Sequence, residues 1–251
     1  MIQTNNFIGL IPARYGSQRL PGKLLKEIEG KSVLYRVFEQ VSKSSILNKI
    51  VIVTDHEDIL NHAISFGAEV FMSKMEHQSG TDRIAEYVSL HPGFNYAINI
   101  QGDEPFIDPK SIDLLAKQMT TNKFDIATLA IEMSSYDLIE NPNTVKVVTD
   151  FNQRALYFSR SPIPFLREQQ NLNSKFSWLK HIGLYSFKRD VLLEVSRLPM
   201  SSLEQFESLE QLRWLQNGYS IGVQLVSDHA IGIDTMEDLV TAISYARKNN
   251  L

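Results

Sequence analysis

Residues 7–25, FIGLIPARYGSQRLPGKLL, join a short apolar run to a basic loop that contains glycine. The run Phe7–Ile11 is followed by Pro12 and is typical of a buried strand. The loop carries three basic residues, Arg14, Arg19 and Lys23. Glycine backbone amides, guanidinium groups and a lysine ammonium all bind phosphate oxygens. Directly after the first strand of an α/β sheet, such a loop favours a triphosphate site over an ordinary solvated surface loop.

Two familiar phosphate-binding motifs are missing from the sequence. Gly30-Lys31-Ser32 resembles the end of a P-loop, but Leu25 stands where the P-loop requires its first glycine. No G-x-G occurs in the chain, which excludes the dinucleotide fingerprint. A phosphate site in the first loop must therefore be of another kind.

Strand-like and helix-like patterns alternate over most of the first half of the chain. Short apolar runs predict strands at 50–53, 68–72 and 96–100. Amphipathic segments predict helices at 32–41, 57–66, 81–90 and 109–119. This alternation predicts an α/β fold with a mainly parallel, Rossmann-like sheet and helices on both faces.

The pattern changes after Asp125, where strand-like runs follow one another with short connections. They are predicted at 126–131, 145–148, 155–158 and 180–187. Helices at 190–196 and 203–216, a strand at 221–226 and a helix at 236–247 complete the prediction. We expect one domain over residues 1–251, with a smaller antiparallel insertion at about 126–200.

Composition narrows the functional classes. The 251 residues are 43% hydrophobic and carry a net charge of −4, which gives no general reason to expect nucleic-acid binding. Cysteine is absent, so disulfides, thiolate metal sites and a cysteine nucleophile are excluded. No apolar run approaches the length of a membrane span, and the N-terminus does not look like a signal peptide. We expect a cytoplasmic protein that binds neither membrane nor nucleic acid.

The segment NIQGDEPFIDP, residues 99–109, places Asp103 and Glu104 after an apolar strand. A carboxylate at that position can hold Mg²⁺ against a nucleotide phosphate, because Mg²⁺ prefers oxygen ligands and keeps few protein contacts. Turn or cap chemistry explains Asp108 before Pro109 well, but explains Gln101-Gly102-Asp103 poorly.

The segment GIDTMEDL, residues 232–239, carries a second candidate carboxylate. Asp234 and Thr235 precede a predicted helix, and either residue would serve as its N-cap. Acidic residues in the first helical turn have an ordinary role as well. Asp234 becomes a candidate metal ligand only alongside Asp103.

At these segments and four others the chain resembles the 3-deoxy-manno-octulosonate (Kdo) cytidylyltransferase family. The matching segments are IPARYGSQRLPGK at 11–23, HQSGTDR at 77–83, NIQGDEPFI at 99–107, YFSRSPIPF at 157–165, KHIGLY at 180–185, ESLEQLRWL at 207–215 and GIDTMEDL at 232–239. Leu24 and Met236 depart from the family, which commonly has proline at both positions. The resemblance implies a nucleotidyltransferase fold and transfer of CMP from CTP to the anomeric hydroxyl of Kdo, with release of pyrophosphate, for lipopolysaccharide biosynthesis.

The resemblance also implies roles for individual residues. Those implied for CTP are Arg14, Ser17, Arg19, Lys23, Ser79, Gly80 and Arg83. Those implied for the sugar acid are Gln101, Arg160, His181, Tyr185, Glu210 and Gln211. Asp103 and Asp234 would bind Mg²⁺, and Arg19, Lys23 and Asp103 would be catalytic. The family further suggests a homodimer, in which the insertion at about 126–200 would serve sugar binding and dimerisation.

Local patterns support part of this assignment. In a strand at 180–187, His181, Gly183 and Tyr185 share one face, while Ile182 and Leu184 share the other. In the predicted helix, one residue in three forms an apolar stripe, at Leu203, Phe206, Leu209, Leu212 and Leu215, and we expect this stripe to be core. Glu210 and Gln211 lie off the stripe, and the pattern alone favours water as their surroundings. Trp178 and Trp214 are predicted to serve packing.

Three other functions compete with this interpretation. A glycosyltransferase of similar fold often carries a D-x-D metal motif, which this chain lacks. A sialic acid cytidylyltransferase shares the first loop but not the segments from residue 157 onward. A nucleotide-sugar sensor without activity would be expected to lose the metal ligands or the phosphate-binding side chains, and these are all present.

Overall fold

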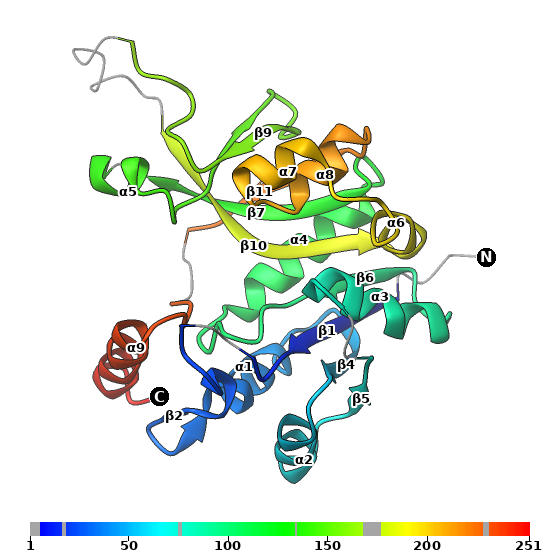
Figure 1. Ribbon diagram of the computed structural model, residues 1–251, viewed down its shortest axis with the longest axis vertical. Coiled ribbons are helices and arrows are strands. Elements are labelled where there is room, and N and C mark those ends of the chain that lie inside the picture. The colour runs from blue at the N-terminus through cyan, green and yellow to red at the C-terminus, as the bar shows by residue number, and fades with distance from the viewer. Residues whose placement is uncertain (1–5, 17–18, 75–76, 134, 168–176, 228–230) are drawn as a thin grey trace.

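A computed structural model describes residues 6–16, 19–74, 77–133, 135–167, 177–227 and 231–251. Among these residues, nine strands form one sheet in the order β11-β7-β10-β6-β1-β4-β5, and β8 and β9 branch from β10 (Figure 1). The strands are β1 (Phe7–Ala13), β4 (Leu47–Thr54), β5 (Val70–Met72), β6 (Tyr96–Asn99), β7 (Ile126–Met133), β8 (Lys146–Thr149), β9 (Ala155–Ser159), β10 (Trp178–Lys188) and β11 (Ile221–Leu225). A separate hairpin joins β2 (Glu27–Ile28) and β3 (Lys31–Ser32).

The sheet is mixed, as predicted. Strand β1 pairs in parallel with β4 and β6, β4 pairs in parallel with β5, and β11 pairs in parallel with β7. Strand β10 runs antiparallel to both β6 and β7, so it joins the two parallel groups. Strands β7 and β10 of the predicted insertion therefore belong to the main sheet, and β8 and β9 form an antiparallel hairpin beside β10.

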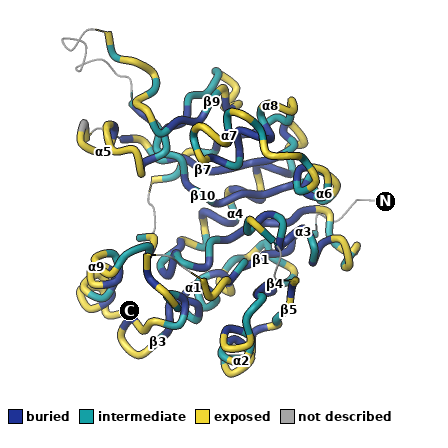
Figure 2. The backbone as a smooth tube through the Cα atoms, in the orientation of Figure 1, coloured by how far each residue is buried: buried dark blue, intermediate teal, exposed yellow. Residues whose placement is uncertain are grey.

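Helices cover both faces of this sheet (Figure 1). They are α1 (Val33–Val41), α2 (Glu57–Ser65), α3 (Gly80–Leu90), α4 (Pro109–Thr120), α5 (Tyr136–Glu140), α6 (Arg189–Val195), α7 (Ser202–Glu207), α8 (Gln211–Gln216), α9 (Met236–Lys248) and the 3₁₀ turn η1 (Lys23–Leu25). The side chains of β1 point to the two faces of the sheet in alternation. Phe7 and Ile11 pack in the core with α1, α4 and α9. Ile8 and Leu10 pack in the opposite core with α3, α6 and α8. Figure 2 shows that the buried residues follow the central strands of the sheet.

One helix prediction was wrong. The segment 203–216 forms two helices, α7 and α8, because Ser208 between them adopts a left-handed φ of 51°. Because of this break, the apolar residues at every third position of 203–216 do not lie on the face of one continuous helix. Leu209 and Leu212 are buried as predicted, but Phe206 is 87% exposed and is not core.

The remaining differences from the predicted elements are small. Up to residue 125 the predicted helices and strands are present with slightly different ends, and the short elements η1, β2 and β3 were not predicted. Helix α5 lies in a stretch where no helix was expected. Among the described residues, no helix is both long enough and apolar enough to span a membrane.

Candidate active site

The loops that follow β1 and β6 meet at the carboxyl ends of these neighbouring parallel strands, where ligands of open α/β sheets bind. Gly102 makes the meeting possible, because a side-chain Cβ there would lie 3.0 Å from the backbone oxygen of Pro12. In the first loop Gly22 adopts a left-handed φ of 64° and leads directly into η1. That turn directs Lys23 towards the loop after β6.

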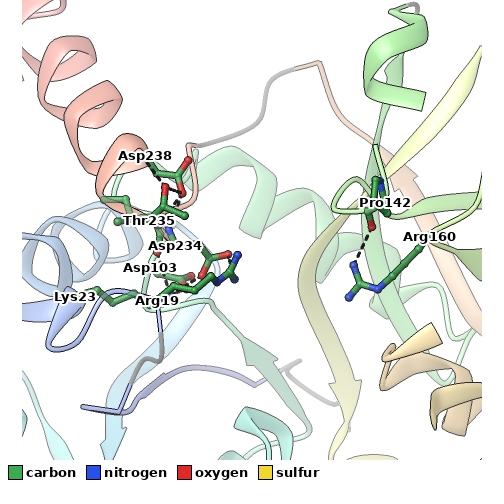
Figure 3. Close-up of polar contacts among 9 residues, drawn as sticks. Arg19, Lys23, Asp103, Pro142, Arg160, Asp234, Thr235 and Asp238 are labelled. Atoms are coloured by element: carbon green, nitrogen blue, oxygen red, sulfur yellow. Dashed lines mark hydrogen bonds and ion pairs between the residues drawn. The ribbon is translucent and has the colours of Figure 1, made fainter. Parts of the chain in front are cut away.

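Lys23 lies at the centre of a charged cluster (Figure 3). Its Nζ donates to Asp103 Oδ2 at 2.5 Å, to Asp234 Oδ1 at 3.0 Å and to the backbone oxygen of Ile233 at 3.0 Å. Arg19 pairs with the other carboxylate oxygen of Asp234 at 2.9 Å. The backbone N–H of Ile233 also donates to the backbone oxygen of Asp103, at 2.9 Å. Four predicted site residues, from three distant segments, therefore form one cluster.

The charges within this cluster stabilise one another. Burial disfavours the ionised carboxylate of Asp234, but the hydrogen bond and charge of Lys23, together with Arg19, outweigh it and lower the Asp234 pKa. Burial likewise disfavours the ammonium of Lys23, but Asp103 and Asp234 outweigh it and raise the Lys23 pKa. At neutral pH the cluster holds charged groups of both signs.

Asp103 and its neighbour Glu104 have different surroundings. The Asp103 carboxylate is partly exposed beside Lys23, whereas Glu104 is buried. Burial, with the adjacent charge of Asp103, raises the pKa of Glu104 to about 8. Glu104 is therefore mostly protonated at neutral pH, and the partly exposed Asp103 is the member of the pair that contacts Lys23.

Oxygen ligands around Lys23 fit a magnesium ion. Two carboxylates already converge on one cation, the Lys23 ammonium, so this position accepts positive charge. Within the described residues, no group of three or more histidine, cysteine or acidic side chains could hold a metal alone. Magnesium is commonly held by one or two carboxylates together with substrate phosphates, and Asp103 and Asp234 offer two carboxylates of this kind.

A cavity of about 250 Å³ opens beside the cluster. Its walls combine the first loop, the segment before α3 and the loop after β6. The predicted residues among its lining are Arg14, Lys23, Ser79, Gly80, Arg83, Gln101, Asp103 and Asp234. Its lining also includes residues that were not predicted to belong to the site, namely Pro12, Leu24, His77, Gln78 and Gly102. Ser17 was predicted to bind CTP and lies outside the described residues.

Two of the residues predicted to bind CTP, Ser79 and Arg83, also have structural roles. The Ser79 hydroxyl caps α3 by accepting a hydrogen bond from the backbone N–H of Asp82, whose carboxylate accepts from the Ser79 N–H in return. Arg83 is buried and donates to Ser73 Oγ and, at 2.8 Å, to Asp55 Oδ2. These contacts fix the cavity wall, and Arg83 can act on a ligand only from a rigid position.

Of the predicted sugar-binding residues, only Gln101 lines the cavity among the described residues, whereas His181 and Tyr185 lie on β10. Gln101 connects the two regions, since it lines the cavity and donates to the backbone oxygen of Gly183 at 2.9 Å. His181 Nε2 lies 3.0 Å from Thr128 Oγ1, and the rings of His181 and Tyr185 lie side by side with centroids 5.3 Å apart. Burial, with the nearby charge of Glu210, raises the pKa of Tyr185 well above its usual value. The alternation predicted for this strand is confirmed, because Ile182 and Leu184 pack into the opposite core.

Glu210 and Gln211 do not face open water, so the expectation from the helix pattern alone was wrong. Gln211 is 5% exposed, and Glu210 Oε2 accepts a hydrogen bond from Thr81 at 2.8 Å. The break at Ser208 turns α8 inward and buries positions that a continuous helix would have exposed. Burial raises the pKa of Glu210.

Arg160 lies apart from the charged cluster (Figure 3). Its guanidinium donates to three backbone oxygens, those of Glu207 at 2.7 Å, Pro142 at 3.0 Å and Ser208 at 3.3 Å. A guanidinium has five N–H donors, so two remain for a ligand. Sequence patterns gave no indication that Arg160 also holds the break between α7 and α8.

Comparison with known proteins places this geometry in a family. A family model described as cytidylyltransferase matches residues 8–221. A 3-deoxy-manno-octulosonate cytidylyltransferase from Fusobacterium nucleatum is 44% identical over 246 residues, which cover 98% of each chain. The same-named protein of Legionella pneumophila is 46% identical over 246 residues, covering 96% of this chain and 97% of the relative.

Solved structures agree with the sequence relatives. A CMP:2-keto-3-deoxy-manno-octonic acid synthetase complexed with CTP matches with a TM-score of 0.92 and 38% identity, over 98% of this chain and 100% of the other. A 4-diphosphocytidyl-2C-methyl-D-erythritol synthase from Anaerococcus prevotii, 16% identical, shares the fold with a TM-score of 0.63 over 98% of this chain and 100% of the other. With the clustered acidic and basic residues at its strand ends, this chain belongs to the 3-deoxy-manno-octulosonate cytidylyltransferase family.

Proposed function

We propose that this chain transfers CMP from CTP to the anomeric hydroxyl of Kdo, giving CMP-Kdo and pyrophosphate. The cluster of Arg19, Lys23, Asp103 and Asp234 beside the cavity is the observation that supports this most directly. It combines two cations for a polyphosphate with two carboxylates for a divalent ion. Family membership supplies the identity of the nucleotide and of the acidic sugar.

Each residue of the cluster would have its own role in the transfer of CMP. Attack by the sugar hydroxyl on the α-phosphorus needs positioning and charge neutralisation more than a covalent intermediate. Arg19 and Lys23 would neutralise phosphate oxygens of CTP, and Arg14 lines the same cavity. Asp103 and Asp234 would hold Mg²⁺, which when bound lowers the pKa of a coordinated hydroxyl and neutralises charge on pyrophosphate.

Release of pyrophosphate tests the proposal. We expect release when CTP and Kdo are both present, none with either substrate alone, and a product with the mass of CMP-Kdo. N-Acetylneuraminic acid serves as the competing acceptor and should react far more slowly. Removal of divalent ions by EDTA should abolish release, and added Mg²⁺ should restore it. Release with CTP alone, or preference for N-acetylneuraminic acid, would contradict the proposal.

Replacement of Tyr185 by phenylalanine examines the sugar side of the site. Among the described residues, the buried Tyr185 hydroxyl has no hydrogen-bond partner, so its removal should not lower thermal stability. If the hydroxyl binds the sugar, the KM for Kdo should rise by about threefold to tenfold, the worth of one neutral hydrogen bond. CTP binding, measured by calorimetry, should be unchanged.

The matched control is Tyr245→Phe, which removes the same hydroxyl from a half-exposed ring on α9. That variant should behave like the unmodified enzyme. An unchanged KM for Kdo in Tyr185→Phe, or an equal change in CTP binding, would contradict a role of Tyr185 in sugar binding.

The oligomeric state and location belong to the same proposal. We propose a homodimer that acts in the cytoplasm, where CTP is available. Exposed apolar side chains on and just after the β8–β9 hairpin support a partner surface in this region, with Phe151, Leu156 and Phe165 exposed by 109%, 59% and 83%. Light scattering should give twice the mass of one chain, and the mass of a single chain would contradict the dimer.

A further inference from the structure

The contact between Thr81 and Glu210 joins the nucleotide half of the site to the sugar half. Thr81 belongs to the first turn of α3, directly after Ser79 and Gly80 in the cavity wall. Glu210 belongs to the segment that leads into α8, next to Gln211. Thr81 Oγ1 donates to Glu210 Oε2 at 2.8 Å across 129 residues of sequence.

This contact has no capping role in either helix. Helix α3 is capped by the reciprocal hydrogen bonds of Ser79 and Asp82, so its start does not require the Thr81 hydroxyl. Glu210 is the residue before α8, but its side chain makes no cap hydrogen bond there. Its carboxylate instead points to the start of α3, where the helix dipole favours negative charge.

Hydroxyl groups, and not a cation, determine the direction of this carboxylate. The side chains of Thr81 and Ser79 both hydrogen-bond the Glu210 carboxyl group. Within the described ranges Glu210 forms no ion pair, and Arg213, whose charge acts on it, is bound to Glu204 through two hydrogen bonds of 2.6 and 2.7 Å. Asp82 lies on the same side and repels a negative charge. Thr81 is 1% exposed, so water does not compete for its hydroxyl.

We propose that Thr81 is a positioning residue, which fixes the Glu210 carboxyl group against the nucleotide-binding wall and so makes the contact of Glu210 with the sugar depend on that wall. The inference rests on the proposed function, in which Glu210 contacts Kdo. A nucleotide that presses on Ser79 and Gly80 fixes the first turn of α3, and through Thr81 it fixes Glu210. Bound CTP therefore strengthens Kdo binding, and the two substrates bind with positive coupling.

Replacement of Thr81 by valine tests this with little change of shape. Valine keeps the branched side chain and the burial but removes the donor to Glu210. The KM for Kdo should rise by about threefold to tenfold, since one hydrogen bond that holds Glu210 is lost. CTP binding by calorimetry should be unchanged. The dependence of Kdo affinity on CTP should weaken clearly, with only the Ser79 contact to Glu210 left to carry it. Thr81→Ser keeps the hydroxyl and should restore the Kdo KM most of the way.

A double variant shows whether Thr81 acts through Glu210. In a Glu210→Ala chain, Thr81→Val should add no further loss, because its only route to the sugar is already removed. Losses that multiply would overturn the inference, and so would a Kdo KM unaffected by Thr81→Val, or CTP binding that falls together with it. Failure of the proposed function is seen separately, as an unmodified chain that releases no pyrophosphate from CTP and Kdo, and it overturns the inference as well.

Discussion

Asp103→Asn is expected to lower turnover by about a hundredfold or more while the fold remains intact. Mutation of a residue that only supports a metal ligand typically lowers metal affinity or activity by about 10- to 100-fold, and loss of the ligand itself should cost more. Asparagine keeps the size of the side chain and removes its charge. The backbone oxygen of Asp103, which accepts from Ile233, is unaffected. Glu104 is a poor substitute for the lost charge, because burial, the larger cause of its raised pKa, persists in the variant even though the like charge of Asp103 is gone.

Two measurements distinguish a lost ligand from a damaged fold. Binding of Mn²⁺ in the presence of CTP, followed by electron paramagnetic resonance, should weaken in step with the loss of turnover, while the melting temperature changes little. The matched control is Asp108→Asn in the same loop, because Asp108 caps α4 and asparagine caps a helix equally well. Normal turnover with normal Mn²⁺ binding in Asp103→Asn would remove Asp103 from the metal site.

The charged cluster could be predicted from the sequence because each member follows directly from a strand or precedes a helix. Lys23 belongs to the loop after β1 and Asp103 to the loop after β6, and strands of a parallel sheet end at the same edge. Local sequence therefore fixes the approximate position of both residues. Asp234, which precedes α9, was a candidate only alongside Asp103, since its local pattern is equally that of a helix start.

The sugar side could not be predicted to the same depth, because its geometry depends on one backbone torsion. A continuous helix over 203–216 exposes Glu210 and Gln211, whereas the left-handed Ser208 divides it and buries Gln211. A left-handed serine carries no sequence signal of the kind that glycine carries. The three backbone contacts of Arg160 and the contact of Thr81 with Glu210 are likewise long-range, so no local pattern could predict them.

Replacement of Lys23 by alanine is the second change with a large expected effect. Lys23 joins Asp103 to Asp234, so its loss removes a phosphate ligand and leaves two carboxylates without the cation between them. We expect kcat/KM for CTP to fall by about a hundredfold or more, as on loss of a preorganised charge-stabilising donor. The melting temperature should also fall, and added Mg²⁺ should raise it more than in the unmodified chain, because a divalent ion can neutralise the same two carboxylates.

The control for this change is Lys26→Ala, which removes an exposed ammonium one residue beyond η1. Both variants lower the net positive charge near the first loop by the same amount, so bulk electrostatics predicts equal losses. The geometry predicts a large loss for Lys23→Ala alone, since only Lys23 is directed between the two carboxylates and into the cavity wall. Steady-state kinetics with varied CTP separates the two cases. Equal kcat/KM values for the two variants would mean that Lys23 contributes only general charge, and the assignment of Lys23 to the reacting phosphates would then be wrong.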